Sequence, residues 1–465
     1  MNNIDFDKIH KIHFIGIGGI SMSGIAIIMK KFGYEVTGSD ISENDMVKIV
    51  KTENIPVNIG SNINNVLNAD IVVYTAAIPS TDAELVAAKE HNIPTYERAV
   101  FLGNMLKNYK KPICIAGMHG KTTTTSMVAN ALKLAKVNPT ILVGSKLREL
   151  NNLNYEIGNN EYFVLESCEY VDSFLNFPGD TSVILNIEEE HLDYFKTLDN
   201  IMSSFGKFMC LVHDSGNLIV NADDKNVMKV LESNFDALTK KNVNIYTFSA
   251  KDSNANLFAN NINLMNTGCY EFDVLYNKNK ICHIKLSAPG RHNILNALAT
   301  VGVVIANNID LNLAVAGLEE FTGASRRFEF KKNINNTVEV YDDYAHHPTE
   351  IKATLQTAKE KSKGRTIAVF QPHTYSRLKT LLDEFATCFN KADIVIVTDI
   401  YAAREKNDGS ITPQMLIERL KANNVNAMYV GDFEEIAKYI RENAKENDIV
   451  LTIGAGTITN LSNLL

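Results

Sequence analysis

Short apolar runs alternate with longer segments of helical periodicity over most of the chain. The runs are three to five residues long and read as buried strands; they are His13–Ile17, Glu35–Thr37, Ile71–Thr75, Ile113–Ala116, Tyr162–Leu165, Ser182–Leu185, Thr366–Phe370, Ile394–Thr398 and Ile449–Ile453. Strands that alternate with helices in this way predict parallel sheets covered by helices, which is an α/β fold.

Two interruptions divide this pattern. The segment Tyr109–Pro112 separates a helix from a new strand, and Phe321–Ser325 follows a long helical stretch. Between about residues 242 and 287 the pattern changes to short alternating strands, which predicts a β-rich addition. A chain of 465 residues is too long for one core. We therefore predict three domains, at residues 1–109, 110–321 (with the β addition) and 322–465.

Composition and charge exclude several classes of protein. The net charge of -8 and the pI near 5.8 argue against a nucleic-acid partner, which usually calls for a basic face. No apolar run approaches the ~18 residues of a membrane span, and the N-terminal segment lacks the core of a signal peptide. Six cysteines form no CxxC pair, as expected for reduced thiols. We therefore expect a cytoplasmic protein with neither a nucleic-acid nor a membrane partner.

A first glycine loop follows the first predicted strand. Gly16, Gly18 and Gly19 precede a helical segment, and the N–H groups of such a turn can bind a diphosphate. Ser21 stands where a dinucleotide fingerprint has its third glycine. Asp40 ends the next strand, where a carboxylate could bind ribose hydroxyls. A nucleotide site is the main interpretation, and a tight turn without a ligand is the alternative.

A second glycine loop carries a lysine. Gly120, Lys121 and Thr122 form the core of a P-loop, in which the lysine reaches nucleotide phosphates and the hydroxyl can bind Mg²⁺. Ile115 stands where the standard pattern has its first glycine, so the loop is shorter and begins at Gly117. A purely structural turn is the weaker alternative.

Further polar residues follow other strands and open one helix. Glu166 and His191 come after predicted strands, so with Thr122 they would suit a cation that bridges to phosphates. Either could instead be an ordinary surface residue. Asn293 and Asn296 lie three apart on one helical face and could bind an adenine edge or cap the helix.

The last predicted domain gathers polar groups at the ends of its strands, where functional loops concentrate. They are Arg326, Arg327, Asp342, Asp343, Tyr344, His346, His347, His373 and Arg377. Each motif alone could instead be an ordinary solvated loop.

Taken together, these motifs resemble the Mur ligase family. The matching segments are "GIGGISMSG", "AGMHGKTTTT", "ESCE", "NIEEEHLD", "PGRHNILNALA", "SRRFE", "DDYAHHPTE" and "FQPHTYSR", spread from about His13 to Gly456. The resemblance implies a Rossmann-like N-terminal domain that binds a UDP-sugar, a central P-loop domain that binds ATP, and a Rossmann-like C-terminal α/β domain. The first loop would hold the diphosphate of one substrate, and the second would hold ATP.

The same resemblance implies roles for single residues. Gly16, Gly18, Gly19, Ser21 and Asp40 would bind the UDP-sugar. Gly117, His119, Gly120, Lys121, Thr122, Thr123, Asn293, Asn296, Arg327 and Asp343 would bind ATP. Thr122, Glu166 (rather than Glu169) and His191 would hold two Mg²⁺ ions, with Mn²⁺ able to substitute. Tyr344, His373 and Arg377 would form the amino-acid site. Lys121, His191, Arg327, His346 and His373 would act in catalysis.

The reaction implied is ATP-dependent joining of L-alanine to the carboxylate of UDP-N-acetylmuramate for peptidoglycan synthesis, through an acyl phosphate and with release of ADP and phosphate. A general base must deprotonate the ammonium of the amino acid, and His346, His347 and His373 all stay candidates. The nearest alternative is a sister ligase that adds a ready-made peptide to the same sugar nucleotide in recycling. An NAD-dependent oxidoreductase and a P-loop kinase or regulatory ATPase are remote alternatives, because each leaves one of the two loops unexplained.

Overall fold

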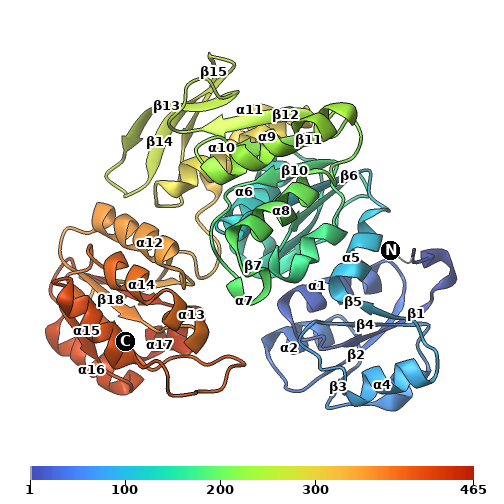
Figure 1. The fold of residues 1–465 in the computed structure, drawn as a ribbon, viewed down its shortest axis with the longest axis horizontal. Coiled ribbons are helices and arrows are strands. Elements are labelled where there is room, and N and C mark those ends of the chain that lie inside the picture. The colour runs from blue at the N-terminus through green and yellow to red at the C-terminus, as the bar shows by residue number, and fades with distance from the viewer. Residues whose placement is uncertain (1–2) are drawn as a thin grey trace. The chain divides into compact units, whose positions relative to one another are not determined.

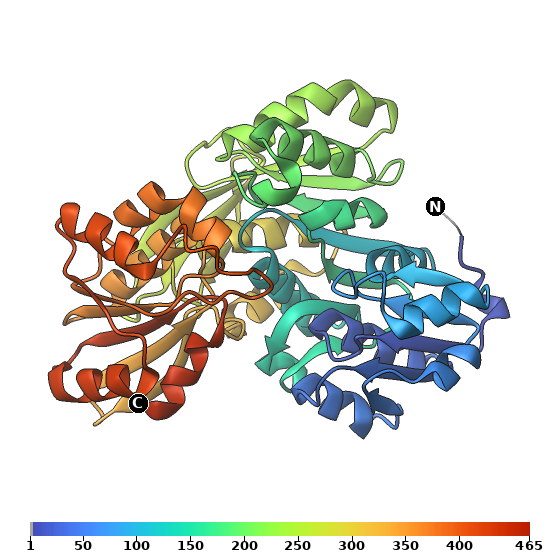
Figure 2. The same cartoon turned by 60° about the horizontal axis from the view of Figure 1, so that its bottom comes forward.

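The computed structural model describes residues 3–465, apart from the side chain of Asp193, and confirms the α/β class (Figures 1 and 2). The chain forms two compact units. The first unit comprises the described residues up to Ala259, with Val274–Cys282 and Asn296–Leu318; the second comprises Asn260–Asp273, His283–Leu295 and Glu319–Leu465. None of the helices described is long and apolar enough to cross a membrane.

The N-terminal sheet has five parallel strands in the order β3-β2-β1-β4-β5. Its strands are β1 (Lys11–Ile15), β2 (Glu35–Asp40), β3 (Val57–Ile59), β4 (Ile71–Tyr74) and β5 (Thr95–Glu97). Its helices are η1 (Phe6–Lys8), α1 (Ile20–Lys31), α2 (Asp45–Thr52), α3 (Ile63–Leu67), α4 (Ala83–Glu90) and α5 (Arg98–Leu106). The chain runs from β1 to β2 on one side and places β4 on the other, so the loop after β1 lies at a topological switch point, where ligands bind in open α/β sheets.

The central sheet has ten strands in the order β15-β14-β13-β12-β11-β10-β6-β9-β7-β8. Its strands are β6 (Lys111–Ala116), β7 (Thr140–Leu147), β8 (Leu153–Glu156), β9 (Tyr162–Glu166), β10 (Thr181–Ile184), β11 (Asn217–Asn221), β12 (Asn244–Ser249), β13 (Leu257–Leu264), β14 (Tyr270–Tyr276) and β15 (Asn279–Lys285). Its helices are α6 (Lys121–Leu134), η2 (Arg148–Leu150), η3 (Tyr170–Asn176), α7 (Leu192–Phe195), α8 (Leu198–Met209), α9 (Lys225–Lys240), α10 (His292–Ala306) and α11 (Leu311–Glu320).

The predicted β addition continues this sheet. Strand β12, which we expected within the addition, pairs in parallel with β11 and belongs to the main sheet. Strand β6 lies between β10 and β9 and is fully apolar over its last five residues, which are buried. The loop after β6 therefore follows an interior strand of the sheet.

The C-terminal sheet, in the second unit, has six strands in the order β16-β17-β21-β18-β19-β20, parallel except for the β16–β17 pair. Its strands are β16 (Glu329–Ile334), β17 (Val338–Asp343), β18 (Thr366–Phe370), β19 (Ile394–Val397), β20 (Ala427–Tyr429) and β21 (Ile449–Ile453). Its helices are α12 (Pro348–Lys361), α13 (Tyr375–Thr380), α14 (Leu382–Cys388), α15 (Pro413–Ala422), α16 (Phe433–Asn443), η4 (Thr457–Asn460) and α17 (Leu461–Leu464).

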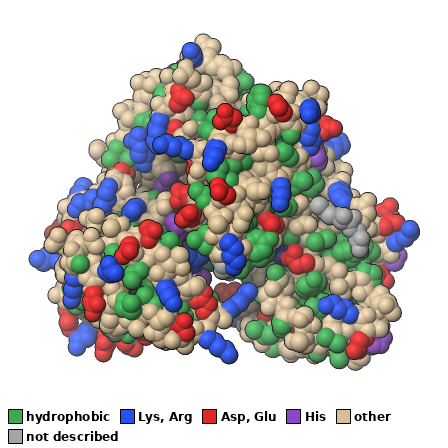
Figure 3. Space-filling view, viewed as in Figure 1, with side chains coloured by type: hydrophobic (Ala, Val, Ile, Leu, Met, Phe, Trp, Pro, Cys, Tyr) green, Lys and Arg blue, Asp and Glu red, His purple; other side chains and the backbone are tan. Residues whose placement is uncertain are grey.

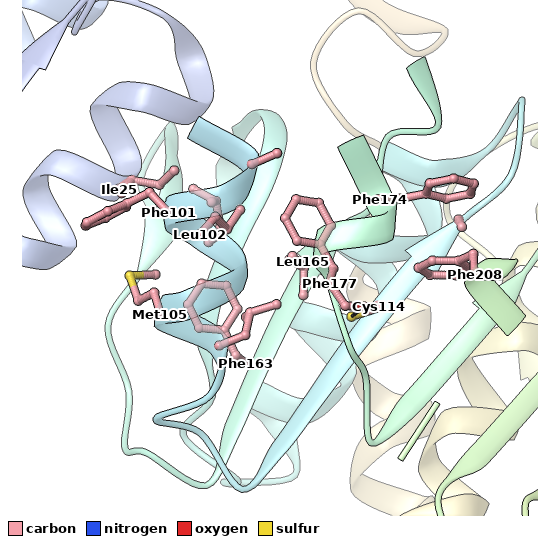
Figure 4. Packing of buried hydrophobic residues seen from close by; sticks show 14 of the residues in the cluster. Ile25, Phe101, Leu102, Met105, Cys114, Phe163, Leu165, Phe174, Phe177 and Phe208 are labelled. Atoms are coloured by element: carbon pink, nitrogen blue, oxygen red, sulfur yellow. Dashed lines mark hydrogen bonds between the residues drawn. The ribbon is translucent and has the colours of Figure 1, made fainter. Parts of the chain in front are cut away.

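One core joins the first two sheets inside the first unit (Figure 4). Helix α5 contributes Phe101, Leu102 and Met105, which pack with side chains from β9 and the segment around η3. Gly103 lets α5 approach closely, because a Cβ at this position would lie 2.1 Å from the carbonyl oxygen of Asn176. Helix α5 is thus packed closely against the sheet that carries the second glycine loop.

Candidate active site

The first glycine loop is held by the end of β2. Gly16 adopts a φ of 78°, and the N–H groups of Gly16 and Ile17 donate to the carbonyl oxygen of Ser39 at 2.8 and 3.0 Å. The carboxylate of Asp40 accepts from the N–H of Gly18 at 2.8 Å. The predicted residues Gly16, Gly18 and Asp40 are therefore brought together, with Asp40 directly against the loop.

An arginine that the sequence analysis missed lies beside this loop. Gly19 caps α1, whose N-terminal N–H groups carry a partial positive charge. The guanidinium of Arg98 donates to the hydroxyl of Ser21 at 3.3 Å, in the first turn of α1. Arg98 is separated from Ser21 by 77 positions and stands in no glycine motif, so no sequence signal pointed to it. The loop thus has a cation suited to a diphosphate.

The second glycine loop, between β6 and α6, is clamped by an asparagine. Gly117 and Gly120 have φ values of 147° and 83°, which favour glycine. The carboxamide of Asn186 accepts from the N–H of His119 at 2.8 Å and donates to its carbonyl oxygen at 2.9 Å. The loop is therefore fixed in the shape of a phosphate cradle at the start of a helix.

The predicted catalytic lysine is buried at the start of α6. The ammonium of Lys121 donates to the carbonyl oxygens of Gly117 and Met118 at 2.6 and 3.1 Å and lies 2.8 Å from the carboxylate of Glu169. Burial disfavours its charge, but the neighbouring carboxylates, above all that of Glu169, raise the pKa of Lys121. Burial disfavours the charge of Glu169 too, which acts to raise its pKa, but Lys121 and His191 lower the pKa of Glu169 to about 2.

The contacts of the three predicted metal ligands involve two different carboxylates. The hydroxyl of Thr122 donates to the carboxylate of Glu166 at 2.9 Å, and the same oxygen accepts from the N–H of Gly144 at 3.1 Å. The Nε2 atom of His191 instead lies 3.4 Å from Glu169. The sequence analysis set Glu169 aside, whereas the structure places its carboxylate between the lysine and the histidine.

The two asparagines of α10 make different contacts. The carboxamide oxygen of Asn296 accepts from the hydroxyl of Thr124 at 3.1 Å, and it would lie 3.0 Å from a Cβ at Gly120. Asn296 therefore borders the P-loop. Asn293 donates to the carbonyl oxygen of Pro289 at 2.7 Å, a bond at the start of its own helix. Thr123, another predicted ATP contact, is buried in the first turn of α6.

In the second unit, two arginines share an aromatic ring. The guanidinium carbons of Arg326 and Arg327 lie 4.8 and 5.4 Å from the ring centre of Tyr344. Asp343 is buried and accepts from the N–H groups of Phe328 and Ala345 at 2.8 and 2.7 Å. Burial raises the pKa of Asp343 to about 6, although Arg327 acts in the opposite direction.

A histidine near Arg327 was also missed. The side chain of His292 is exposed, and the Arg327 cation acts to lower the pKa of His292. His292 opens α10 beside the predicted Asn293, and its type alone did not mark it.

The remaining predicted residues form a histidine cluster at the carboxyl ends of β17 and β18. The rings of His346 and His373 have centres 5.8 Å apart, and His373 stacks on Tyr401 at 5.8 Å. Arg377 reaches Nδ1 of His373 at 2.9 Å. Glu350 lies 3.4 Å from Nδ1 of His346 and 3.6 Å from the guanidinium of Arg327. The structure thus brings together the predicted amino-acid and catalytic residues of this unit.

Comparison of the sequence with known proteins identifies the family of this chain. Models of the Mur ligase catalytic domain, middle domain and glutamate ligase domain match residues 11–110, 115–304 and 326–456. The UDP-N-acetylmuramate–L-alanine ligase of Caldicellulosiruptor bescii is 49% identical over 457 residues, which are 98% of either chain. The chain belongs to the Mur ligase family. This confirms the resemblance seen in the motifs.

Two solved structures place this Mur ligase more narrowly. The UDP-N-acetylmuramate–alanine ligase MurC of Thermotoga maritima has a TM-score of 0.81 and 31% identity, covering 97% of either chain. A murein peptide ligase of Psychrobacter arcticus has a TM-score of 0.70 and 25% identity, covering 98% of this chain and 97% of that one. The likeness is greater to the alanine ligase.

Proposed function

We propose that this Mur ligase joins L-alanine to the carboxylate of UDP-N-acetylmuramate and converts ATP to ADP and phosphate. The observation that carries the proposal is the full-length match to an alanine ligase at 49% identity, together with intact glycine loops in both sheets of the first unit. An oxidoreductase would have no use for the lysine-bearing loop, and a regulatory ATPase would have none for the first loop. Basic and acidic side chains are interspersed over the face drawn in Figure 3, which does not suggest a nucleic-acid surface.

The first loop is proposed to bind the UDP-sugar. Because Gly16, Gly18 and Gly19 have no side chains, a diphosphate could approach the backbone at the start of α1. Ser21 and Arg98 offer a hydroxyl and a cation in the first turn, while Asp40 holds the loop and could bind a ribose hydroxyl. This guanidinium supplies a local positive charge in a chain whose net charge is -8.

The second loop is proposed to bind the ATP phosphates, and Lys121 would neutralise charge on the phosphoryl group in transfer. In the first unit, the proposed ATP contacts are Gly117, His119, Gly120, Lys121, Thr122 and Thr123, with Asn296 proposed to bind adenine. In the second unit, Asn293 (for adenine), Arg327 and Asp343 stay predicted ATP contacts.

A divalent cation fits the donor set around Glu166. Its carboxylate meets the hydroxyl of Thr122 in a pair of oxygen donors of the kind that Mg²⁺ prefers. We propose that Thr122, Glu166 and His191 hold magnesium, which would neutralise phosphate charge when bound. Glu169 already pairs with Lys121, so it serves that cation instead.

The chemistry follows from the weakness of a carboxylate as an acyl donor. An oxygen of the muramate carboxylate attacks the γ-phosphorus of ATP, the bond to ADP breaks, and an acyl phosphate forms. The amine of L-alanine then attacks the carbonyl carbon, and phosphate leaves as the amide forms. We propose that Tyr344, His373 and Arg377 orient the amino acid, so that the protein acts mainly by positioning and charge stabilisation.

The test is phosphate release from ATP and Mg²⁺ with UDP-N-acetylmuramate. It is run with L-alanine, with L-Ala-γ-D-Glu-meso-diaminopimelate, and with neither. Release that requires L-alanine and is abolished in Lys121→Ala supports the proposal. Release that requires the tripeptide would assign the chain to the recycling ligases, and release that ignores both would overturn a ligase function.

A further inference from the structure

Three histidines of the second unit could accept a proton from the incoming amino acid: His346, His347 and His373. A neutral imidazole carries a proton on one ring nitrogen and a lone pair on the other. Only the nitrogen with the lone pair can act as a base. The hydrogen-bond partner of Nδ1 therefore decides which nitrogen of each ring carries the lone pair.

His373 is fixed in the wrong state for a base. Its Nδ1 lies 2.9 Å from a guanidinium nitrogen of Arg377, and a guanidinium only donates. The lone pair of His373 is thus directed at Arg377, and the ring proton sits on Nε2. A second proton would place an N–H against the arginine cation. His373 is suited to donate a hydrogen bond, for instance to the carboxylate of an amino acid.

His347 is engaged as a helix cap. Its Nδ1 accepts from the N–H of Thr349 at 3.3 Å, at the start of α12, and its side chain is buried. The lone pair of His347 therefore satisfies the backbone, and its proton sits on Nε2. This histidine holds the loop in place.

His346 has the opposite tautomer. Its Nδ1 lies 3.0 Å from the carbonyl oxygen of Tyr344, which can only accept, so Nδ1 carries the proton and Nε2 carries the lone pair. The carboxylate of Glu350 lies 3.4 Å from the same Nδ1 and accepts from the backbone N–H of His346 at 3.0 Å. A carboxylate beside the protonated nitrogen stabilises the imidazolium that a base must become.

We propose that Nε2 of His346 is the general base for the incoming amino acid, and that Glu350 positions and stabilises it. This inference rests on the proposed ligase function. One proton of the ammonium moves to Nε2, and the neutral amine attacks the acyl phosphate. The C–N bond forms, the C–O bond to phosphate breaks, and the second proton leaves with the phosphate. The imidazolium then returns its proton to water.

Charged or titratable groups lie against His346 or against its neighbours. Glu350 favours the imidazolium, whereas the nearby arginines and the second imidazole oppose it. The groups in contact with His346 are Glu350, Tyr344 and His373. The arginines contact these neighbours: Arg327 lies beside Glu350, Arg326 beside Tyr344, and Arg377 beside His373.

The experiment compares two nucleophiles in two matched variants. L-alanine must lose a proton before it attacks, whereas hydroxylamine is largely neutral near pH 7 and needs no base. His346→Asn and His373→Asn each replace an imidazole by an amide that can keep the bond made by Nδ1. Amide and hydroxamate formation are measured at saturating ATP and UDP-N-acetylmuramate, over a range of pH.

In His346→Asn, we expect kcat with L-alanine to fall about 10²–10⁴-fold, and far more than kcat with hydroxylamine. In this variant, the pH profile of kcat with L-alanine should lose the limb that reports ionisation of the imidazole. Instead, kcat should rise in proportion to the fraction of L-alanine that is already unprotonated. Glu350→Gln should move that limb to lower pH, because the imidazole loses its carboxylate. His373→Asn should chiefly raise KM for L-alanine.

Equal loss with both nucleophiles in His346→Asn would overturn the assignment, as would a nucleophile-selective loss in His373→Asn. His346→Gln and thermal unfolding of each variant separate a failure of folding from a failure of proton transfer. If the unaltered protein forms no hydroxamate from UDP-N-acetylmuramate and ATP, the proposed ligase function itself fails.

Discussion

The ammonium of Lys121 and the carboxylate of Glu169 lie 2.8 Å apart, with side chains that are 12% and 1% exposed. Removing one partner of a buried ion pair leaves a buried charge unpaired, which costs about 3–5 kcal/mol. We therefore expect Glu169→Gln to lower the free energy of unfolding by about this amount. Because the chain has no tryptophan, urea unfolding is best followed by circular dichroism.

A double-mutant cycle isolates the pair. Lys121→Met combined with Glu169→Gln should destabilise less than the sum of the single changes, with a coupling free energy of about 1–3 kcal/mol. The matched control is Glu166→Gln, since that carboxylate accepts from Thr122 and makes no ion pair with the lysine. Coupling as strong through Glu166 as through Glu169 would contradict the proposed pairing.

The same pair predicts how acid affects stability. The pKa of Glu169 is about 2 in the fold, against about 4.3 in an unfolded chain. The unfolded state binds the proton first as pH falls, so this stabilisation is complete above the unfolded pKa and is lost between about pH 4.3 and 2. Urea midpoints should decline less steeply between pH 5 and 3 in Glu169→Gln. Parallel declines in both proteins would argue against the pair as the source.

The sequence predicted the two glycine loops well because their signals are local. Glycines with positive φ, such as Gly120, leave a direct mark in the sequence, and Glu166 ends a strand whose apolar pattern is plain. All nine predicted strands exist, although the first ends at Ile15, since Gly16 turns the chain. The strands that were missed include β3 and β20, each of three residues, which is too short for a period to show.

Partners distant in sequence could not be predicted. Arg98 reaches Ser21, and Asn186 clamps His119, only because the sheet order brings separate loops to one edge. The contact of Glu169 could not be predicted for the same reason, because its partner Lys121 lies 48 positions away in the sequence. A sequence also does not show which ring nitrogen donates or accepts a hydrogen bond. The three histidines were therefore equally good candidates for the base until the partners of their Nδ1 atoms were known.

Arg98 yields a prediction for the first loop. If its guanidinium binds the diphosphate, Arg98→Met removes a charge-assisted hydrogen bond worth about 1.5–3 kcal/mol. KM for UDP-N-acetylmuramate should then rise about 10–100-fold, while KM for ATP changes little. Arg419→Met is the control, because Arg419 pairs with Asp383 on the surface of the second unit. An equal rise in both Michaelis constants would place Arg98 outside the sugar-nucleotide site.

Two adjacent glycines provide the last prediction. A Cβ at Gly18 would lie 2.7 Å from the side-chain amide of Asn44 and 2.8 Å from the carboxylate of Asp40, whereas a Cβ at Gly19 meets nothing closer than 3.5 Å. Gly18→Ala must therefore displace the carboxylate that accepts from the N–H of Gly18. Overpacking of this kind costs about 1–3 kcal/mol.

We expect Gly18→Ala to lower stability by that amount and to raise KM for UDP-N-acetylmuramate about tenfold or more, since 1.4 kcal/mol corresponds to a factor of ten. Gly19→Ala adds the same methyl group one position along, at a φ of −67° that any residue adopts, and should have a much smaller effect on both quantities. The two variants differ only in what the methyl group meets. If they behave alike, Asp40 does not hold the loop in the form that binds the substrate, and its carboxylate would instead serve the ribose alone.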